Sequence, residues 1–169
     1  MATGDPHFNC KTGIVAKEEE RLVSFDPGQD LGMYSPKKLK EVISNVNILF
    51  GNHHEIKRIQ DSMNVDINGL MDLGPEVVLM TCGSKGSIIY SPDEGKIEVE
   101  SIYRPAVDPT GAGDSYKAGF VSRLIYGASL EEAAKFASSV SSFVVEKQGC
   151  QTNMPSNDDA YNRMVDFYK

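Results

Sequence analysis

The chain alternates short apolar runs with longer amphipathic stretches, and this alternation restricts the folds available to it. The apolar runs are rich in Val, Ile and Leu and end at polar residues or glycine, which is typical of buried strands. The amphipathic stretches carry apolar residues three or four positions apart, as one face of a helix requires. Strands that alternate with helices favour a mostly parallel sheet covered on both faces. The predicted fold class is α/β, and we expect one domain over residues 1–169.

The expected elements follow from where the pattern changes. Strands are predicted at 21–26, 47–50 and 76–81, and a hairpin at 87–91 and 96–101. Helices are predicted at 36–46, 52–63, 67–73, 116–126, 130–147 and 158–168. The Ala and Ser residues of the 130–147 helix allow it to pack closely against a neighbour. In open α/β sheets ligands bind beyond the carboxyl ends of the strands, so the loops that follow the strands are the candidate sites.

Charge and composition restrict the classes of function. The chain has 24 acidic against 17 basic residues and a formal net charge of −7, which argues against a nucleic acid as partner. No apolar run approaches the length of a membrane span, and the first residues resemble neither a signal peptide nor a transit peptide. Cys10, Cys82 and Cys150 are widely spaced, so ordinary thiols in a reducing compartment are expected. We therefore expect a soluble, cytoplasmic protein with no membrane partner.

One segment places small residues and a carboxylate at the start of a helix. It runs from Asp108 to Phe120 and reads DPTGAGDSYKAGF. Gly111 and Gly113 let an anion approach the backbone, and the helix start offers unpaired N–H groups and the positive end of its dipole. Asp114, beside that cradle, can accept the proton of a hydroxyl group that attacks a bound phosphate. The alternative is that Asp114 caps the helix and the glycines form a turn.

Other nucleotide-binding motifs are excluded by the residues themselves. No Gly-Lys-Ser or Gly-Lys-Thr occurs, so the chain has no P-loop. It has neither the His-Arg-Asp nor the Asp-Phe-Gly motif of protein kinases. A dinucleotide-binding fingerprint needs a third glycine where this chain has Tyr116.

The Asp108–Phe120 segment resembles the C-terminal signature of the ribokinase family, the phosphofructokinase-B type of carbohydrate and nucleoside kinases. The resemblance covers essentially the whole chain and is closest to archaeal-type nucleoside kinases, carried by residues 2–6, 24–30, 115–120, 143–146 and 149–153. It implies a ribokinase-like three-layer α/β/α sandwich and transfer of the γ-phosphoryl group of ATP to a hydroxyl group of a nucleoside or sugar. Asp114 would be the base, and the amides of Gly111, Ala112, Gly113 and Asp114 the anion hole.

Two further motifs resemble the family's nucleotide and magnesium sites. Asn52 and Glu55 match its Asn-x-x-Glu motif, which implies Glu55 as the Mg²⁺ residue and Asn52 as a nucleotide-binding residue. The alternative is an N-capping Asn and a solvated Glu. Thr81, Gly83 and Gly86 resemble its nucleotide-binding turn, with a plain strand–turn–strand connection as the alternative.

The C-terminal helices carry the remaining matches. The position of Ser138 lies beside the adenine in relatives, with simple helix packing as the alternative. A monovalent-cation site in some members is lined by the segments that match Asp108, Thr110, Gly149 and Asn153. The implied cofactors are therefore ATP, Mg²⁺ and K⁺, although Lys147 lies near the last site and leaves the use of potassium open.

Members of the family are longer than this chain. The part without a counterpart here carries the first strands of the sheet, the β-sheet lid and the residues that hold the substrate. We therefore expect a truncated domain whose exposed sheet edge favours association into a homo-oligomer. Asp5 and Asp26 are candidates for substrate contact, and each equally suits a turn. Two other functions stay open, namely a catalytically incomplete nucleotide-binding fragment and an interaction partner completed by another chain.

Overall fold

The structure is a computed structural model that describes residues 5–169, so residues 2–4 of the first matching segment lie outside the described part. Those residues form two compact units, which we describe separately. The first unit contains residues 5–81 together with Ile88–Ile97, and the second contains Cys82–Ser87 together with Glu98–Lys169. The prediction of one domain stays a prediction.

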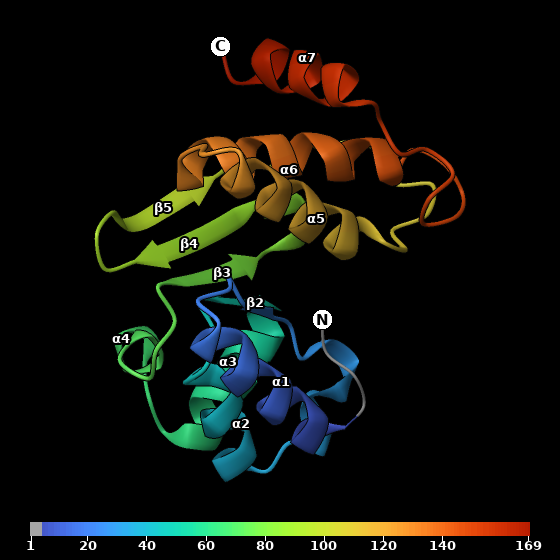
Figure 1. The fold of residues 1–169 in the computed structure, drawn as a ribbon. Helices are drawn as coiled ribbons and strands as arrows, with labels where there is room; N and C mark the ends of the chain where they lie inside the picture. The colour runs from blue at the N-terminus through green and yellow to red at the C-terminus, as the bar shows by residue number, and fades with distance from the viewer. Residues whose placement is uncertain (1–4) are drawn as a thin grey trace. The chain divides into compact units, whose positions relative to one another are not determined.

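The strands form a five-stranded sheet in the order β1-β2-β3-β4-β5. Figure 1 labels β2, β3, β4 and β5. The strands are β1 (Ser24–Phe25), β2 (Ile48–Asn52), β3 (Val77–Thr81), β4 (Ser87–Ser91) and β5 (Gly95–Val99). The β1–β2 and β2–β3 pairs are parallel, with Phe25 opposite Leu49 and Asn52 opposite Thr81. The carboxyl ends of these three strands therefore lie at one edge, as the sequence predicts. β4 and β5 form the predicted hairpin.

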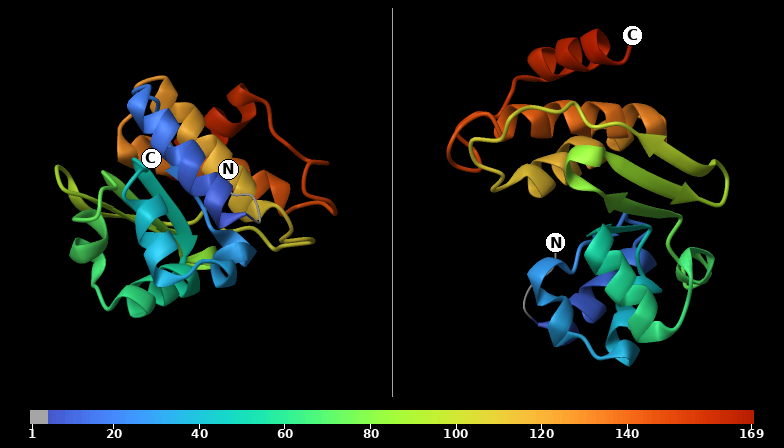
Figure 2. Two further views of the ribbon diagram at one scale, coloured as in Figure 1. Left: turned by 60° about the horizontal axis from the view of Figure 1, so that its bottom comes forward. Right: turned by 180° about the vertical axis from the view of Figure 1, so that it is seen from behind.

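The helices of the first unit begin where polar side chains can cap them. They are α1 (Pro6–Glu18), the 3₁₀ helix η1 (Gly28–Met33), α2 (Pro36–Ile43), α3 (His53–Met63) and α4 (Ile67–Met71). The Ser35 hydroxyl accepts the N–H of Lys38 at 3.3 Å, which confirms the predicted start of α2. α1 packs against α2 (Figure 2).

Helix α1 and the 3₁₀ helix η1 are absent from the sequence prediction. The buried positions of α1 are Asn9, Cys10 and Gly13, which are polar or small. A helix that buries such residues carries no apolar period, and that period is the signal on which helix prediction depends.

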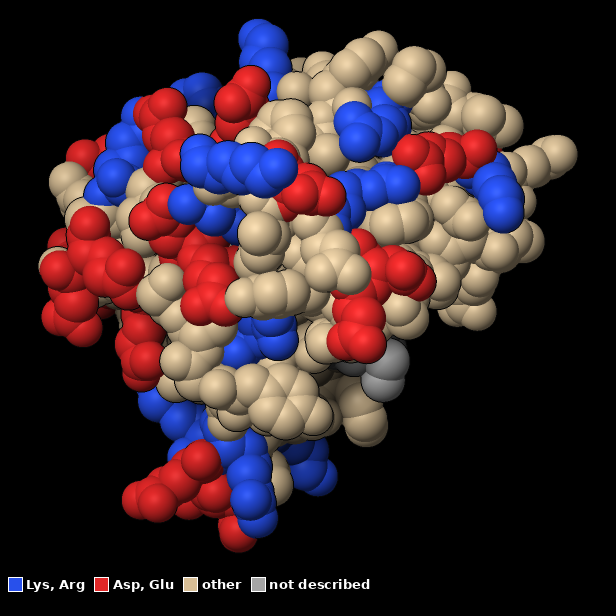
Figure 3. All heavy atoms as spheres, turned by 90° about the horizontal axis from the view of Figure 1, so that it is seen from above, with Lys and Arg blue, Asp and Glu red and all other residues tan. Residues whose placement is uncertain are grey.

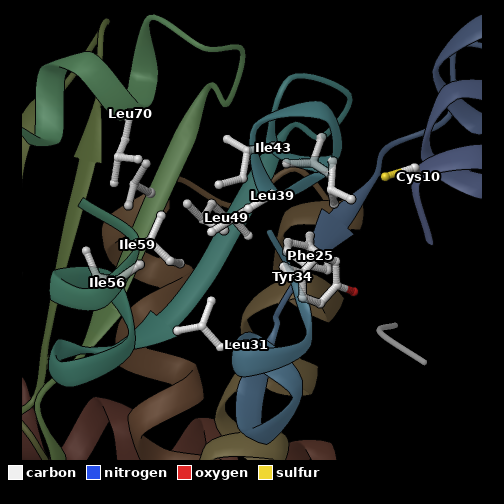
Figure 4. Close-up of a cluster of buried hydrophobic side chains, with 13 residues drawn as sticks. Cys10, Phe25, Leu31, Tyr34, Leu39, Ile43, Leu49, Ile56, Ile59 and Leu70 are labelled. Atoms are coloured by element: carbon white, nitrogen blue, oxygen red, sulfur yellow. The ribbon is translucent and has the colours of Figure 1, made fainter. Parts of the chain in front are cut away.

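The core of the first unit is a cluster of aliphatic and aromatic side chains from its helices and from β1, β2 and β3 (Figure 4). Ile43, Leu49, Ile59 and Leu70 are fully buried in it. The rings of Phe25 and Tyr34 meet edge to face with centroids 5.6 Å apart. Burial of this kind contributes about 1.5–3 kcal/mol for each large side chain, which is the main source of stability for such a unit.

The second unit is built from η2 (Gly83–Lys85), α5 (Ala112–Ile125), α6 (Leu130–Val144) and α7 (Asn157–Phe167). Small residues bring α5 and α6 together, since a Cβ atom added to Gly119 would lie 3.2 Å from the Cα of Ala137. The predicted close packing of α6 is thereby confirmed. α7 packs on α6 through Phe136, Val140 and Met164.

Two helix boundaries in this unit differ from the prediction by more than one residue. α5 begins at Ala112 rather than at residue 116, so Asp114 lies within its first turn. α6 ends at Val144 rather than at residue 147. At this end the carbonyl of Phe143 accepts the N–H of Glu146, three residues later, and the side-chain amide of Asn153.

The surface carries charges of both signs. On the face shown in Figure 3, Lys and Arg side chains lie between Asp and Glu side chains. Across residues 5–169, none of the helices has the length and apolar character needed to cross a membrane.

Candidate functional site

The turn before α5 is held in place by Asp108. Its Oδ1 accepts the N–H of Thr110 at 2.9 Å and its Oδ2 accepts the N–H of Gly149 at 2.9 Å. Hydrogen bonds from the Thr110 side chain, the Gly149 N–H and the Thr110 N–H lower the pKa of the Asp108 carboxyl. One carboxylate thus joins the turn to a segment that is distant in the sequence.

Gly111 ends this turn and is the N-cap of α5. Its φ is +81°, in the left-handed region that favours glycine. A Cβ atom at this position would lie 2.5 Å from the Cβ of Cys150. Gly111 is therefore required both by its backbone conformation and by the close approach of the 149–150 segment.

Gly113 and Asp114 differ from Gly111, since neither has a packing role. A Cβ atom added to Gly113 would meet nothing within 4 Å. The Asp114 side chain is 85% exposed, and α5 has no side-chain cap. Within residues 5–169, the N–H groups of these two residues find no backbone acceptor, whereas the N–H of Ala112 donates to the carbonyl of Pro109 at 3.2 Å. The turn thus presents two open donors and a carboxylate side by side.

Lys117 follows Asp114 by one helical turn. Its Nζ lies 2.8 Å from Asp114 Oδ1, and its side chain is 23% exposed. Residues three apart on a helix are neighbours, so this ion pair can be expected from the spacing alone. Sequence reasoning included Lys117 in the motif but gave it no role.

The two glycines of the turn after β3 have different surroundings. Gly86 has a φ of +94°, and a Cβ atom there would lie 2.0 Å from the carbonyl oxygen of Val99. The neighbouring backbone therefore requires glycine at this position, and contact of Gly86 with a nucleotide stays a prediction. Gly83 has a φ of +59° and open space around its Cβ position, so a ligand can approach its backbone. Thr81, at the end of β3, is half-buried opposite Asn52.

A buried hydrogen bond connects the start of β4 to α5. The hydroxyl groups of Ser87 and Tyr116 lie 2.7 Å apart, and both residues are buried. Burial raises the pKa of the Tyr116 phenol, and its hydrogen bond with Ser87 opposes that rise. This pair was missed by sequence reasoning because nothing local in the sequence connects the two residues.

Ser138 is buried in α6 and has a structural contact. Its hydroxyl accepts the N–H of Ile102 at 2.8 Å, so it ties the chain after β5 to the helix. A role beside an adenine ring stays a prediction. Asn153, from the proposed cation group, donates its side-chain amide to the carbonyl of Phe143 at 2.6 Å.

In the first unit, Asn52 and Glu55 form a capping box at the start of α3. Asn52 Oδ1 accepts the N–H groups of His54 and Glu55 at 2.9 and 3.0 Å, and Glu55 Oε2 accepts the N–H of Asn52 at 2.7 Å. Mg²⁺ commonly uses one carboxylate plus waters and phosphates, and Glu55 Oε1 has no hydrogen bond within the described chain. The pair is therefore compatible with both capping and a magnesium role.

The two candidate substrate residues act in turns of the first unit. Asp5 is the N-cap of α1 and accepts the N–H groups of His7 and Phe8 at 2.9 and 3.3 Å. Asp26 accepts the N–H of Gly28 at 3.0 Å. These contacts account for both residues without a substrate, and their role in binding stays a prediction.

The parallel β1–β2–β3 strands and the helices between them make this an α/β protein with a glycine turn at the start of α5. Residues 1–157 match the family described as pfkB family carbohydrate kinase. The chain belongs to this family. The predictions of family and fold class are thereby confirmed.

Relatives agree with this assignment. The chain is 53% identical over 165 residues to the nucleoside kinase of Methanothermobacter thermautotrophicus, covering 98% of this chain and 53% of that protein. The crystal structure of the Methanocaldococcus jannaschii nucleoside kinase matches with a TM-score of 0.89 at 43% identity, over 97% of this chain and 54% of that one. Arabidopsis thaliana ribokinase complexed with ribose and ATP matches with a TM-score of 0.82 at 25% identity, over 95% and 53%. The chain spans about half the length of the curated relatives it matches.

Proposed function

We propose that this chain is the nucleotide-binding portion of a small-molecule kinase that transfers the γ-phosphoryl group of ATP to a hydroxyl group of a nucleoside or sugar. The proposal rests on a contrast between two positions. Packing requires a glycine at position 111, but it does not require one at position 113. A glycine inside a helix costs about 0.5–1 kcal/mol relative to alanine. The helix dipole accounts for an acid in the first turn but not for this glycine. Access of a ligand to the backbone accounts for the glycine.

In the proposed reaction, an Asp114 carboxylate oxygen accepts the proton of the acceptor hydroxyl group. The hydroxyl oxygen forms a bond to the γ-phosphorus while the bond from that phosphorus to the β,γ-bridging oxygen breaks, and ADP leaves. The N–H groups of Gly113 and Asp114 donate to the oxygens of the transferred phosphoryl group and stabilise the charge that develops on them. Gly111 and Ala112 complete the turn that positions these donors.

The remaining candidate residues hold the nucleotide and its ions in this proposal. Glu55 would bind Mg²⁺ through its open oxygen and ordered waters, which would supply charge neutralisation for the phosphates. Thr81 and Gly83 would contact the nucleotide, since the backbone at Gly83 is open to a ligand. A monovalent cation at Asp108 would share a carboxylate that already accepts two N–H groups.

A second candidate function is nucleotide binding without turnover. The chain spans about half of its relatives' length, and transfer requires an acceptor hydroxyl group held in line with the γ-phosphoryl group. The names of the relatives favour a nucleoside as that acceptor.

Calorimetry and turnover assays on the 169-residue chain test both candidates. We expect Mg·ATP to bind, and any phosphorylation of a nucleoside or sugar panel to fall about 10²–10⁴-fold in Asp114→Asn, as loss of a general base predicts. Asp158→Asn is the matched control, because Asp158 is an exposed acid in the first turn of α7. Binding with no turnover favours the second candidate. A chain that binds no nucleotide refutes both, and full turnover by Asp114→Asn refutes the base.

A further inference from the structure

Lys117 is a basic residue beside the proposed phosphate site that the reaction described above does not use. Its Nζ lies 2.8 Å from Asp114 Oδ1, on the first turn of α5. Helical side chains point toward the N-terminus, so a lysine one turn into the helix carries its ammonium group back to the level of the helix start. The ammonium group is thus held against the side chain of Asp114, a residue of the first turn of α5.

The two partners of this ion pair are held differently. The Lys117 side chain is 23% exposed, whereas the Asp114 side chain is 85% exposed. The lysine stem is therefore largely buried, and the carboxylate is the partner open to solvent. Water screens an ion pair whose carboxylate is exposed, so a ligand with more negative charge can displace the carboxylate from the ammonium group.

The proposed site contains an electrostatic conflict that a lysine would resolve. A carboxylate next to a bound triphosphate repels it, and a carboxylate paired with an ammonium group is not free to accept a proton. A single positive charge that moves from the carboxylate to the γ-phosphoryl group removes both obstacles at once.

We propose that Lys117 binds the γ-phosphoryl group of ATP and, on doing so, releases Asp114 to act as the base. In the free protein Lys117 pairs with Asp114, and in the nucleotide complex it pairs with the phosphoryl oxygens. Lys117 is then a residue that distinguishes a triphosphate from a diphosphate. This inference rests on the proposed function, because it takes the turn before α5 as the phosphate site.

Titration calorimetry with Mg·ATP and Mg·ADP on the 169-residue chain tests the inference. We expect Lys117→Met to raise the Kd for Mg·ATP about tenfold, as loss of one charge-assisted contact predicts, and to change the Kd for Mg·ADP less than about twofold. Lys117→Arg should restore most of the preference for ATP. Asp114→Asn should tighten Mg·ATP binding when Lys117 is present, and should do so less in the Lys117→Met background.

Lys135→Met is the matched control. Lys135 forms a similar ion pair with Glu131 at 2.6 Å near the start of α6, and its side chain is 32% exposed. Lys135→Met should leave the dissociation constants for Mg·ATP and Mg·ADP unchanged. Equal effects of Lys117→Met on ATP and ADP, or no effect on either, would overturn the role of Lys117 while the proposed function stands. A wild-type chain that binds neither nucleotide overturns the proposed function and this inference with it.

Discussion

At the scale of single residues, the two glycines of the turn before α5 do opposite things. Gly111 is fixed by a positive φ and by contact with Cys150, whereas Gly113 has open space where a side chain would be. The sequence motif alone does not distinguish these two glycines. Their difference follows from the approach of a segment that is distant in the chain, which no local pattern reveals.

This difference predicts opposite effects of the same substitution. Gly111→Ala should lower the free energy of unfolding by about 1–3 kcal/mol, because the new methyl group meets Cys150 and the backbone is strained. Gly113→Ala should leave stability equal or raise it by up to about 1 kcal/mol, since alanine favours a helix. Urea denaturation of both variants measures this. Equal losses in the two variants would contradict the assignment of Gly113 to a ligand.

At the scale of elements, most of the fold could be predicted because the apolar period follows each strand and most of the helices. The Asn52–Thr81 juxtaposition also follows from the parallel order of strands, which brings their carboxyl ends to one edge. Helix α1 could not be predicted, since Asn9 and Gly13 occupy its buried face. The reason for Gly86 could not be predicted either, because the Val99 carbonyl that requires it belongs to the partner strand of the hairpin.

The Ser87–Tyr116 hydrogen bond should couple the start of β4 to α5. Tyr116→Phe leaves the Ser87 hydroxyl buried without this partner, so we expect a loss of about 1–3 kcal/mol in the free energy of unfolding. Ser87→Ala should cost a similar amount. Because both changes remove the same hydrogen bond, the double variant should lose less free energy of unfolding than the sum of the two single losses. Additive losses in a double-mutant cycle would show that the two hydroxyl groups do not interact.

At the scale of the whole molecule, Asp108 links acidity to stability. The pKa of its carboxyl is lowered in the folded chain, so its contribution is complete above the ordinary value of 3.8 and is lost as the pH falls through the lower folded value. Wild type should have a higher free energy of unfolding than Asp108→Asn at neutral pH. The difference between the two free energies should become smaller as the pH falls below 3.8. Unfolding measured across this range provides the check. A gap that stays constant with pH would contradict the role of the charge.

The loop that contains Asp108 also completes a helix, since the N–H groups of Val107 and Asp108 both donate to the carbonyl of Val145 at the end of α6. Natural selection for folding alone would therefore preserve Asp108, Gly111 and Gly149 in a descendant that no longer transferred phosphoryl groups. The same descendant would be free to change Gly113 and Asp114, since a side chain at position 113 meets open space and the Asp114 side chain is exposed. Divergence between these two groups of positions would thus separate lineages that keep the chemistry from those that keep only the fold.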